Sequence, residues 1–199
     1  MRWNASFAPI FVIFFLAAAK SATSQVSPAS TRSSATLSAG IGLSYYNADY
    51  SNADNMLGLS VWVDYGPPYM PHIFSGLKIE AEGRDVNFNR PSSLSRFREY
   101  TFLGGPIYFY SWHRYPHFRP YGKALFGIGS MDFPPYGTYD HDSRTVFAPG
   151  GGADYSLKHN LLVRADYEYQ IWPVLISKTR HPQGFTIGVL YTFGGDHRY

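Results

Sequence analysis

The end of the chain alternates strictly between two kinds of residue. From Phe185 to Phe193, apolar or aromatic side chains occupy every second position. The residues that separate them are Thr186, Gly188, Leu190 and Thr192. A period of two predicts a β-strand. A strand of about nine such residues is long enough to cross the hydrocarbon layer of a membrane. If earlier segments repeat this pattern, the chain is predicted to form a transmembrane barrel. These apolar positions are Phe185, Ile187, Val189, Tyr191 and Phe193.

The beginning of the chain reads as a secretory signal. Arg2 precedes an apolar stretch from Phe7 to Ala19, and small residues follow it. This stretch is shorter than the roughly 18 residues of a spanning helix. We therefore predict a signal peptide over residues 1–24, cut after Ser24 or alternatively after Ser21. A disordered leader rich in Ser, Thr and Pro is predicted over residues 25–34, and the barrel domain over residues 35–199.

Composition narrows the classes of function. Removing the signal peptide lowers the count of Lys and Arg from 17 to 15, because Arg2 and Lys20 lie within it, against 14 Asp and Glu. With that near-neutral balance and no basic cluster, no nucleic-acid partner is expected. The absence of cysteine excludes disulfides, thiol catalysis and cysteine-ligated metals. Charged residues make up only 16% and aromatic residues 18%, a balance that disfavours a soluble domain.

Seven earlier segments also carry strand patterns, so that eight strands are predicted. The eight predicted strands span residues 36–45, 57–65, 77–84, 98–110, 119–131, 146–157, 161–169 and 185–193. Because the count is even and nothing predicts a helix between them, we expect an all-β fold: an eight-stranded antiparallel up-and-down transmembrane β-barrel. Both chain ends would then be periplasmic. The long loops outside the cell would be residues 47–55, 85–96, 132–144 and 171–183.

Charged residues lie on the strand faces opposite the aliphatic ones. A Lys or Arg exposed to lipid near the midplane costs about 2–4 kcal/mol, so a membrane barrel must place these charges in its lumen. There, bases and acids would neutralise one another. The predicted lumen charge network is Lys78, Glu80, Glu82, Arg84, Lys123, Asp154, Arg164, Asp166 and Glu168. Tyrosines near strand ends favour a membrane barrel over a soluble lipocalin-like one. The facing of residues 98–110 stays open, because Gly104 and Gly105 blur the pattern and admit a bulge.

Three internal segments and the closing strand resemble the small bacterial outer-membrane barrels, which share an OmpA-like or porin-like outer-membrane β-barrel domain. These segments are Tyr100-Thr-Phe-Leu-Gly-Gly-Pro106, Arg119-Pro-Tyr-Gly-Lys-Ala-Leu-Phe-Gly127 and Gly150-Gly-Gly-Ala-Asp-Tyr155. The resemblance covers about residues 35–193 and describes how a barrel is built rather than a reaction. It implies that the closing strand is an assembly signal read by the barrel-assembly machinery, with signal residues Phe185, Ile187, Val189, Tyr191 and Phe193. Either Phe193 or Tyr199 would be the terminal aromatic of that signal.

Candidate chemistry is sparse. Gly150, Gly151 and Gly152 are not followed by a phosphate-loop Lys, and His113 and His117 lie in a Pro-rich turn that disfavours a helical metal site. A Ser/His/acid set at the barrel rim must be considered, but the His-x-Ser-Asn signature of the lipid A deacylases is absent. We therefore predict no enzymatic activity, no cofactor and no metal site.

The expected protein is a non-enzymatic barrel of the bacterial outer membrane, with a structural or adhesion-like surface role and a lumen plugged by charged side chains. Its expected partners are outer-membrane lipid and lipopolysaccharide, the barrel-assembly machinery during insertion, and an extracellular ligand that the loops contact. The alternatives are a small ion-permeable pore, a lipid-modifying barrel enzyme and a soluble lipocalin-like ligand-binding barrel.

Overall fold

The computed structural model describes residues 35–49, 55–68, 71, 74–88, 98–112, 114–132, 141–175 and 178–193. The predicted signal peptide and leader, residues 1–34, lie outside the described residues, as does Tyr199. No helix in the described part of the chain is long and apolar enough to cross a membrane.

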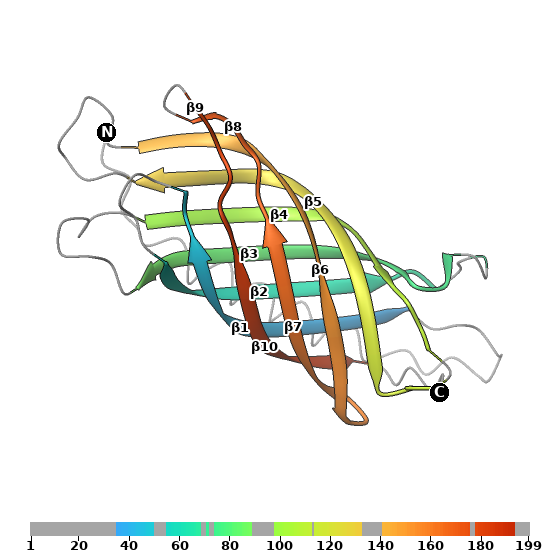
Figure 1. Ribbon diagram of the computed structural model, residues 1–199. Helices are drawn as coiled ribbons and strands as arrows, with labels where there is room; N and C mark the ends of the chain where they lie inside the picture. Colours follow the sequence, from blue (N-terminus) through green and yellow to red (C-terminus); the bar gives the residue numbers. More distant parts are fainter. Residues whose placement is uncertain are drawn as a thin grey trace, which may run out of the picture. The chain divides into compact units, whose positions relative to one another are not determined.

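The described residues form ten strands. They are β1 (Thr36–Asn47), β2 (Met56–Gly66), β3 (Leu77–Phe88), β4 (Arg98–Phe109), β5 (Phe118–Asp132), β6 (His141–Lys158), β7 (Leu161–Tyr169), β8 (Trp172–Leu175), β9 (Lys178–Arg180) and β10 (Gln183–Phe193). Eight of them close into one barrel in the order β1-β10-β7-β6-β5-β4-β3-β2 (Figure 1), and β8 pairs with β9 in a separate hairpin. The predicted eight-stranded antiparallel barrel is confirmed.

The first and last strands of the barrel form its seam. β1 pairs with β10 without a break, from Leu37 opposite Phe193 to Asn47 opposite Gln183. Each neighbouring pair around the barrel is antiparallel, so the strand ends gather at two rims. We call the rim where β1 ends and β10 begins the loop end, and the opposite rim, where residues 159–160 join β6 to β7, the turn end.

The outer face of the barrel is apolar, as the alternation predicts. Leu43, Phe102 and Ile128 are each exposed over about two thirds of their surface (67%, 64% and 66%). The five residues of the closing strand named above point outward in the same way. Because the charged residues of β3 and β7 occupy the opposite face, the aliphatic wall surrounds a polar interior.

The structure settles the facing of β4. Glu99, Leu103 and Ile107 are fully or almost fully buried in the interior, whereas Phe102 and Tyr108 point outward. The register of β4 with β3 runs without a shift, so β4 pairs with that strand without a bulge. The sequence pattern was ambiguous because two glycines in the middle of the strand present no side chain to either face.

Three predictions were wrong at the loop end. β3 continues to Phe88, so the predicted loop 85–96 begins inside a strand. β6 begins at His141 rather than near Val146, because its pairing with β5 continues to Asp132 opposite His141. The predicted loop 171–183 contains the β8–β9 hairpin, which is anchored to the barrel by reciprocal backbone hydrogen bonds between Phe147 and Ile171. This return brings Trp172, which is fully buried, into the interior.

Candidate functional site: the barrel lumen

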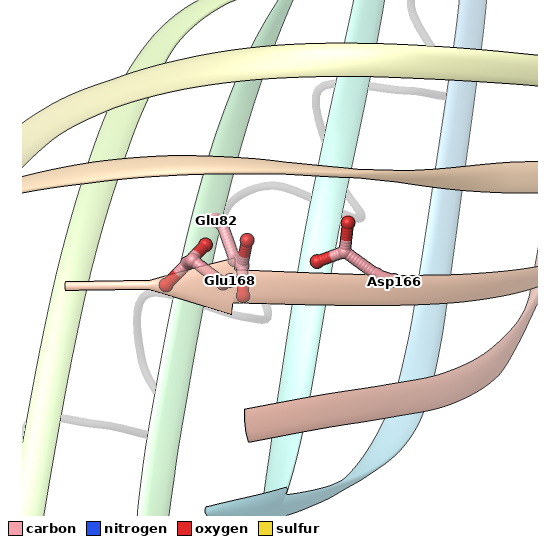
Figure 2. A group of neighbouring side chains, drawn as sticks. All are labelled: Glu82, Asp166 and Glu168. Carbon is pink, nitrogen blue, oxygen red and sulfur yellow. The ribbon is translucent and has the colours of Figure 1, made fainter. Parts of the chain in front are cut away.

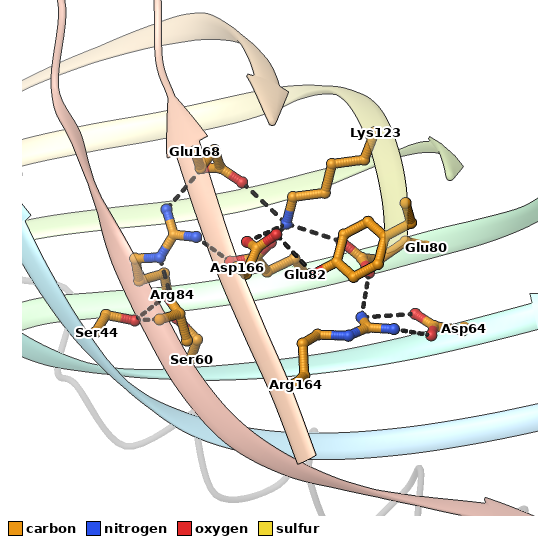
Figure 3. A network of polar contacts seen from close by, with 12 residues as sticks. Ser44, Ser60, Asp64, Glu80, Glu82, Arg84, Lys123, Arg164, Asp166 and Glu168 are labelled. Atoms are coloured by element: carbon orange, nitrogen blue, oxygen red, sulfur yellow. Dashed lines mark hydrogen bonds and ion pairs between the residues drawn. The ribbon is translucent and has the colours of Figure 1, made fainter. Parts of the chain in front are cut away.

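Two strands on opposite sides of the barrel supply most of the buried charge. On β3 the inward positions are Glu80, Glu82 and Arg84, and on β7 they are Arg164, Asp166 and Glu168, which follow from the period of two. All six are at most 5% exposed. β5 contributes Lys123 and β6 contributes Asp154. Side chains from β3, β5 and β7 meet in the lumen (Figure 3).

The ammonium group of Lys123 lies at the centre of the network. Its Nζ atom is 2.7 Å from Asp166 Oδ2, 2.8 Å from Glu82 Oε2, 3.1 Å from Glu80 Oε1 and 3.3 Å from Glu168 Oε2. One cation therefore joins carboxylates from β3 and β7. Tyr121, two residues earlier on β5, also donates its hydroxyl hydrogen to Asp166 at 2.7 Å.

Arg84 extends the network toward the seam. Its Nη1 atom donates to Glu168 Oε1 at 2.7 Å, and its guanidinium also pairs with Glu82. Its Nε atom donates to the Ser60 hydroxyl at 3.0 Å, and Ser60 continues to Ser44 at 2.6 Å. A hydroxyl group thus accepts from Arg84 Nε on the side of β2, where Ser60 lies opposite Arg84 in the register.

Arg164 forms a second centre nearer the turn end. Its Nε atom donates to Asp154 Oδ1 at 2.8 Å, its Nη2 atom to Asp64 Oδ2 at 2.7 Å and its Nη1 atom to Glu80 Oε2 at 2.6 Å. Glu80 also contacts Lys123, so it links the two centres. Paired, hydrogen-bonded charges are the form in which a low-dielectric interior tolerates ions.

Among the residues that the structure describes, acids outnumber bases in this interior. Seven carboxylates are buried: Asp64, Glu80, Glu82, Glu99, Asp154, Asp166 and Glu168. Three cations are buried with them: Arg84, Lys123 and Arg164. The expected near-balance of four bases and five acids was therefore wrong. Lys78 is only half-buried, with its Nζ atom 5.2 Å from the centre of the Phe109 ring. Asp64 and Glu99, which are not among the predicted members of the network, are also buried in the interior.

Three of the carboxylates are close enough together to suggest a metal site. Oxygen atoms of Glu82, Asp166 and Glu168 all lie within 4.8 Å of one another (Figure 2). Lys123 Nζ, however, lies within 3.3 Å of an oxygen of each. The positive charge that this cluster needs is thus supplied by an ammonium group of the chain itself.

Apolar layers flank the charged layer. On the loop-end side a buried cluster contains Tyr46, Met56, Val86, Leu103, Leu125, Met131, Val146, Ala148 and Trp172. On the turn-end side Trp62 packs with Leu162 and Leu190, and Ile107 packs with Phe109 and Tyr121. Trp62 fits here because Gly40 and Gly42 face it: a Cβ atom on Gly40 would lie 2.6 Å from the indole nitrogen.

Trp172 connects the buried apolar layer on the loop-end side to the charged layer. Its indole N–H donates to Gln170 Oε1 at 2.7 Å, and Gln170 Nε2 donates to Glu168 Oε1 at 2.9 Å. Sequence reasoning missed this residue because a single Trp in a Pro-containing loop has no periodicity. Across the loop end, Asp49 accepts hydrogen bonds from the Arg180 side chain and the His181 backbone, which ties the segment after β1 to the β8–β9 hairpin and the residue that follows it.

A closed eight-stranded antiparallel sheet with aliphatic side chains outside and ionisable ones inside defines a membrane-spanning β-barrel. Water would have to solvate the apolar wall of such a molecule, whereas lipid matches it. The soluble lipocalin-like alternative requires the opposite arrangement of faces, with its aliphatic residues inside.

The chain belongs to the family of the outer membrane protein beta-barrel domain, whose model matches residues 11–193. This family membership places the protein in the bacterial outer membrane, as predicted. The family is defined by its fold rather than by a reaction. No curated protein matches the chain in sequence.

Solved structures of other small barrels resemble this fold. Neisserial surface protein A is 13% identical with a TM-score of 0.62, covering 80% of this chain and 97% of that one. Ail, the attachment invasion locus protein of Yersinia pestis, is 20% identical with a TM-score of 0.53 and the same coverage. The N-terminal barrel of Pseudomonas aeruginosa OprF is 13% identical with a TM-score of 0.50, covering 78% and 97%. At these identities the likeness concerns the fold alone.

Proposed function

We propose that the protein is a closed, non-conducting barrel whose role lies in the outer loops, as a structural or adhesion-like surface protein. One observation supports this proposal: the buried ion-pair network lies between two groups of buried apolar side chains, so three layers of side chains extend into the lumen. We call these three layers the plug. An eight-stranded barrel is only wide enough for side chains to fill it. The loop end faces the cell exterior in this proposal.

The competing function is a small ion-permeable pore, and conductance separates the two. Purified barrel is reconstituted into planar bilayers, and its insertion is verified by co-flotation with vesicles and by the heat-dependent gel mobility of a folded barrel. We expect inserted protein to produce no sustained current steps, because an ion would have to displace Lys123 or Arg164 from its carboxylates. Sustained steps from verified, folded protein would overturn the plug.

The surface role is tested separately through the second outer loop. Between β3 and β4, residues 89–97 carry two arginines, Arg90 and Arg96, and no acid. Ail has been solved in complex with the heparin analogue sucrose octasulfate, so immobilised heparin is a reasonable probe. We expect whole cells that display the barrel to bind heparin, and Arg90→Gln with Arg96→Gln to reduce binding at least several-fold. The matched control is Lys158→Gln at the turn end; equal loss in both variants, or no binding by the wild type, would contradict a role for this loop.

A further inference from the structure

Four polar side chains gather on the outer wall of the barrel, where the β5–β6 hairpin approaches the loop end. Ser130 and Asp132 end β5, and His141 and Ser143 begin β6. In the register, Asp132 lies opposite His141 and Ser130 lies opposite Ser143. Because the period is two, all four share the face that carries Phe126 and Ile128 on β5 and Phe147 on β6.

Their order in space is acid, imidazole, hydroxyl. His141 Nδ1 lies 2.6 Å from Asp132 Oδ1, and His141 Nε2 lies 3.1 Å from Ser143 Oγ. When Nδ1 carries the hydrogen and donates it to Asp132, Nε2 is left as an acceptor for the Ser143 hydroxyl. Ser130 Oγ lies 3.2 Å from His141 Nε2 and accepts from Ser143 Oγ at 3.2 Å, so the Ser143 hydroxyl hydrogen has two acceptors, of which Nε2 is the nearer.

The position along the wall indicates what reaches this cluster. Phe126 and Phe147 stack with ring centres 4.5 Å apart, and Ile128 is 66% exposed, so the wall just below is apolar. Ser130 is two residues beyond Ile128, a rise of about 7 Å along an antiparallel strand. The cluster thus lies about 7 Å beyond Ile128 toward the loop end, at the edge of the apolar, lipid-facing surface. His141 is 59% exposed on its side chain, so a lipid has access to it.

We propose that Ser143, His141 and Asp132 form a hydrolytic site for acyl esters of outer-leaflet lipids. Ser143 Oγ attacks the ester carbonyl carbon while His141 Nε2 takes the hydroxyl proton. The imidazolium then gives this proton to the departing alkoxide, which leaves as an alcohol. Water, deprotonated by the same imidazole, cleaves the acyl-serine to a free fatty acid and restores the hydroxyl. Asp132 is a positioning residue, because it acts through the imidazole.

Ser143 rather than Ser130 is assigned as the nucleophile on geometry. Ser130 Oγ is almost equally distant from both ring nitrogens, 3.2 and 3.3 Å, which places it beside the ring rather than along the Nε2 lone pair. Ser130 instead lies where its hydroxyl can donate to an oxygen bound near Ser143. The site is independent of the lumen, because no residue of the plug belongs to it, and it revises the prediction of a protein without catalysis.

The test uses the full-length barrel, purified from outer membranes and reconstituted in vesicles. A fluorophosphonate probe reports an activated serine, and release of p-nitrophenol from p-nitrophenyl palmitate and acetate reports ester cleavage. We expect the probe to label the wild type, and the wild type to hydrolyse the palmitate ester faster than the acetate ester. Ser143→Ala and His141→Ala should lose the labelling, and their hydrolysis rates should fall at least 100-fold. Ser156→Ala, on the same strand at the turn end, is the matched control and should match the wild type.

Two further variants separate catalysis from structure. Asp132→Asn should keep the heat-dependent gel mobility of a folded barrel but lower the rate and change its pH profile, because the imidazole loses the partner of its Nδ1 hydrogen. Ser130→Ala keeps the nucleophile and the base but loses the hydroxyl beside the bound oxygen, so it should still be labelled at Ser143 and should hydrolyse the ester more slowly than the wild type. The assignment would be overturned if the wild type were labelled no more than folded Ser143→Ala, or if the two proteins hydrolysed the esters at equal rates. Neither result would change the conductance measured in planar bilayers, which tests the plug separately.

Discussion

Removal of the central ammonium group is the sharpest test of the lumen. Lys123→Met keeps the length and much of the volume of the side chain but leaves Glu80, Glu82, Asp166 and Glu168 around a site without positive charge. At an effective dielectric constant near 20, a pair of charges about 3 Å apart attracts by roughly 5 kcal/mol before desolvation is subtracted. Measured losses on breaking one partner of a buried pair are about 3–5 kcal/mol. We therefore expect the free energy of unfolding to fall by about 3–5 kcal/mol.

The assay is reversible urea unfolding in lipid vesicles, followed by the mobility difference between folded and unfolded barrel. Lys158→Met, at an exposed position of the turn end, should change the free energy of unfolding by less than about 0.5 kcal/mol. Adding Glu82→Gln to Lys123→Met should recover part of the loss, because one uncompensated carboxylate is removed. A Lys123→Met barrel within 1 kcal/mol of the wild type, or a double variant less stable than the single one, would refute the assignment of Lys123 as the centre of the plug.

Three further outcomes follow from other parts of the barrel. Trp172→Ala should lower the free energy of unfolding by about 3–5 kcal/mol in the same assay, yet remain silent in bilayers, because the charged layer stays in place; sustained current would contradict this. Asp49→Gly should preserve the backbone conformation, because a φ of 51° suits glycine, but it removes the side-chain acceptor of the His181 amide. Hydrogen exchange at that amide should therefore accelerate, while the free energy of unfolding changes by about 1 kcal/mol. Unchanged exchange would contradict the link between Asp49 and His181. Phe193→Ala should reduce the amount of barrel in the outer membrane several-fold while Tyr199→Ala does not, measured by fractionation; the reverse pattern would assign the assembly signal to Tyr199.

The alternation in the sequence was sufficient for the strands and for their facing wherever side chains mark both faces. Leu43 and Ile187 point outward, and Glu82 and Arg164 inward, as the period of two requires. The pattern failed in β4, where adjacent glycines mark neither face. Strand pairing also extends past the last apolar residue, because backbone hydrogen bonds need no particular side chain, and so β6 began before its predicted start.

The candidate sites show a different limit. Membership of the lumen follows from facing alone, but which partner each ion finds depends on the register and tilt that bring β3 and β7 to face each other. Trp172 enters the lumen through a chain reversal that carries no periodic signal. At the rim, the spacing of His141 and Ser143 was visible in the sequence, whereas Asp132 became their neighbour only through the pairing of β5 with β6.

The seam has a consequence for how this molecule reaches its folded state. β1 and β10 lie at opposite ends of the barrel's sequence, so their pairing encloses nearly the whole domain in one loop, and such distant contacts make folding slow. Until they meet, each strand offers an unpaired backbone edge to any other chain, and the unfinished sheet has neither a lumen nor a place for its buried ions. An insertion machine that holds one of these edges would therefore act against aggregation as much as it accelerates closure.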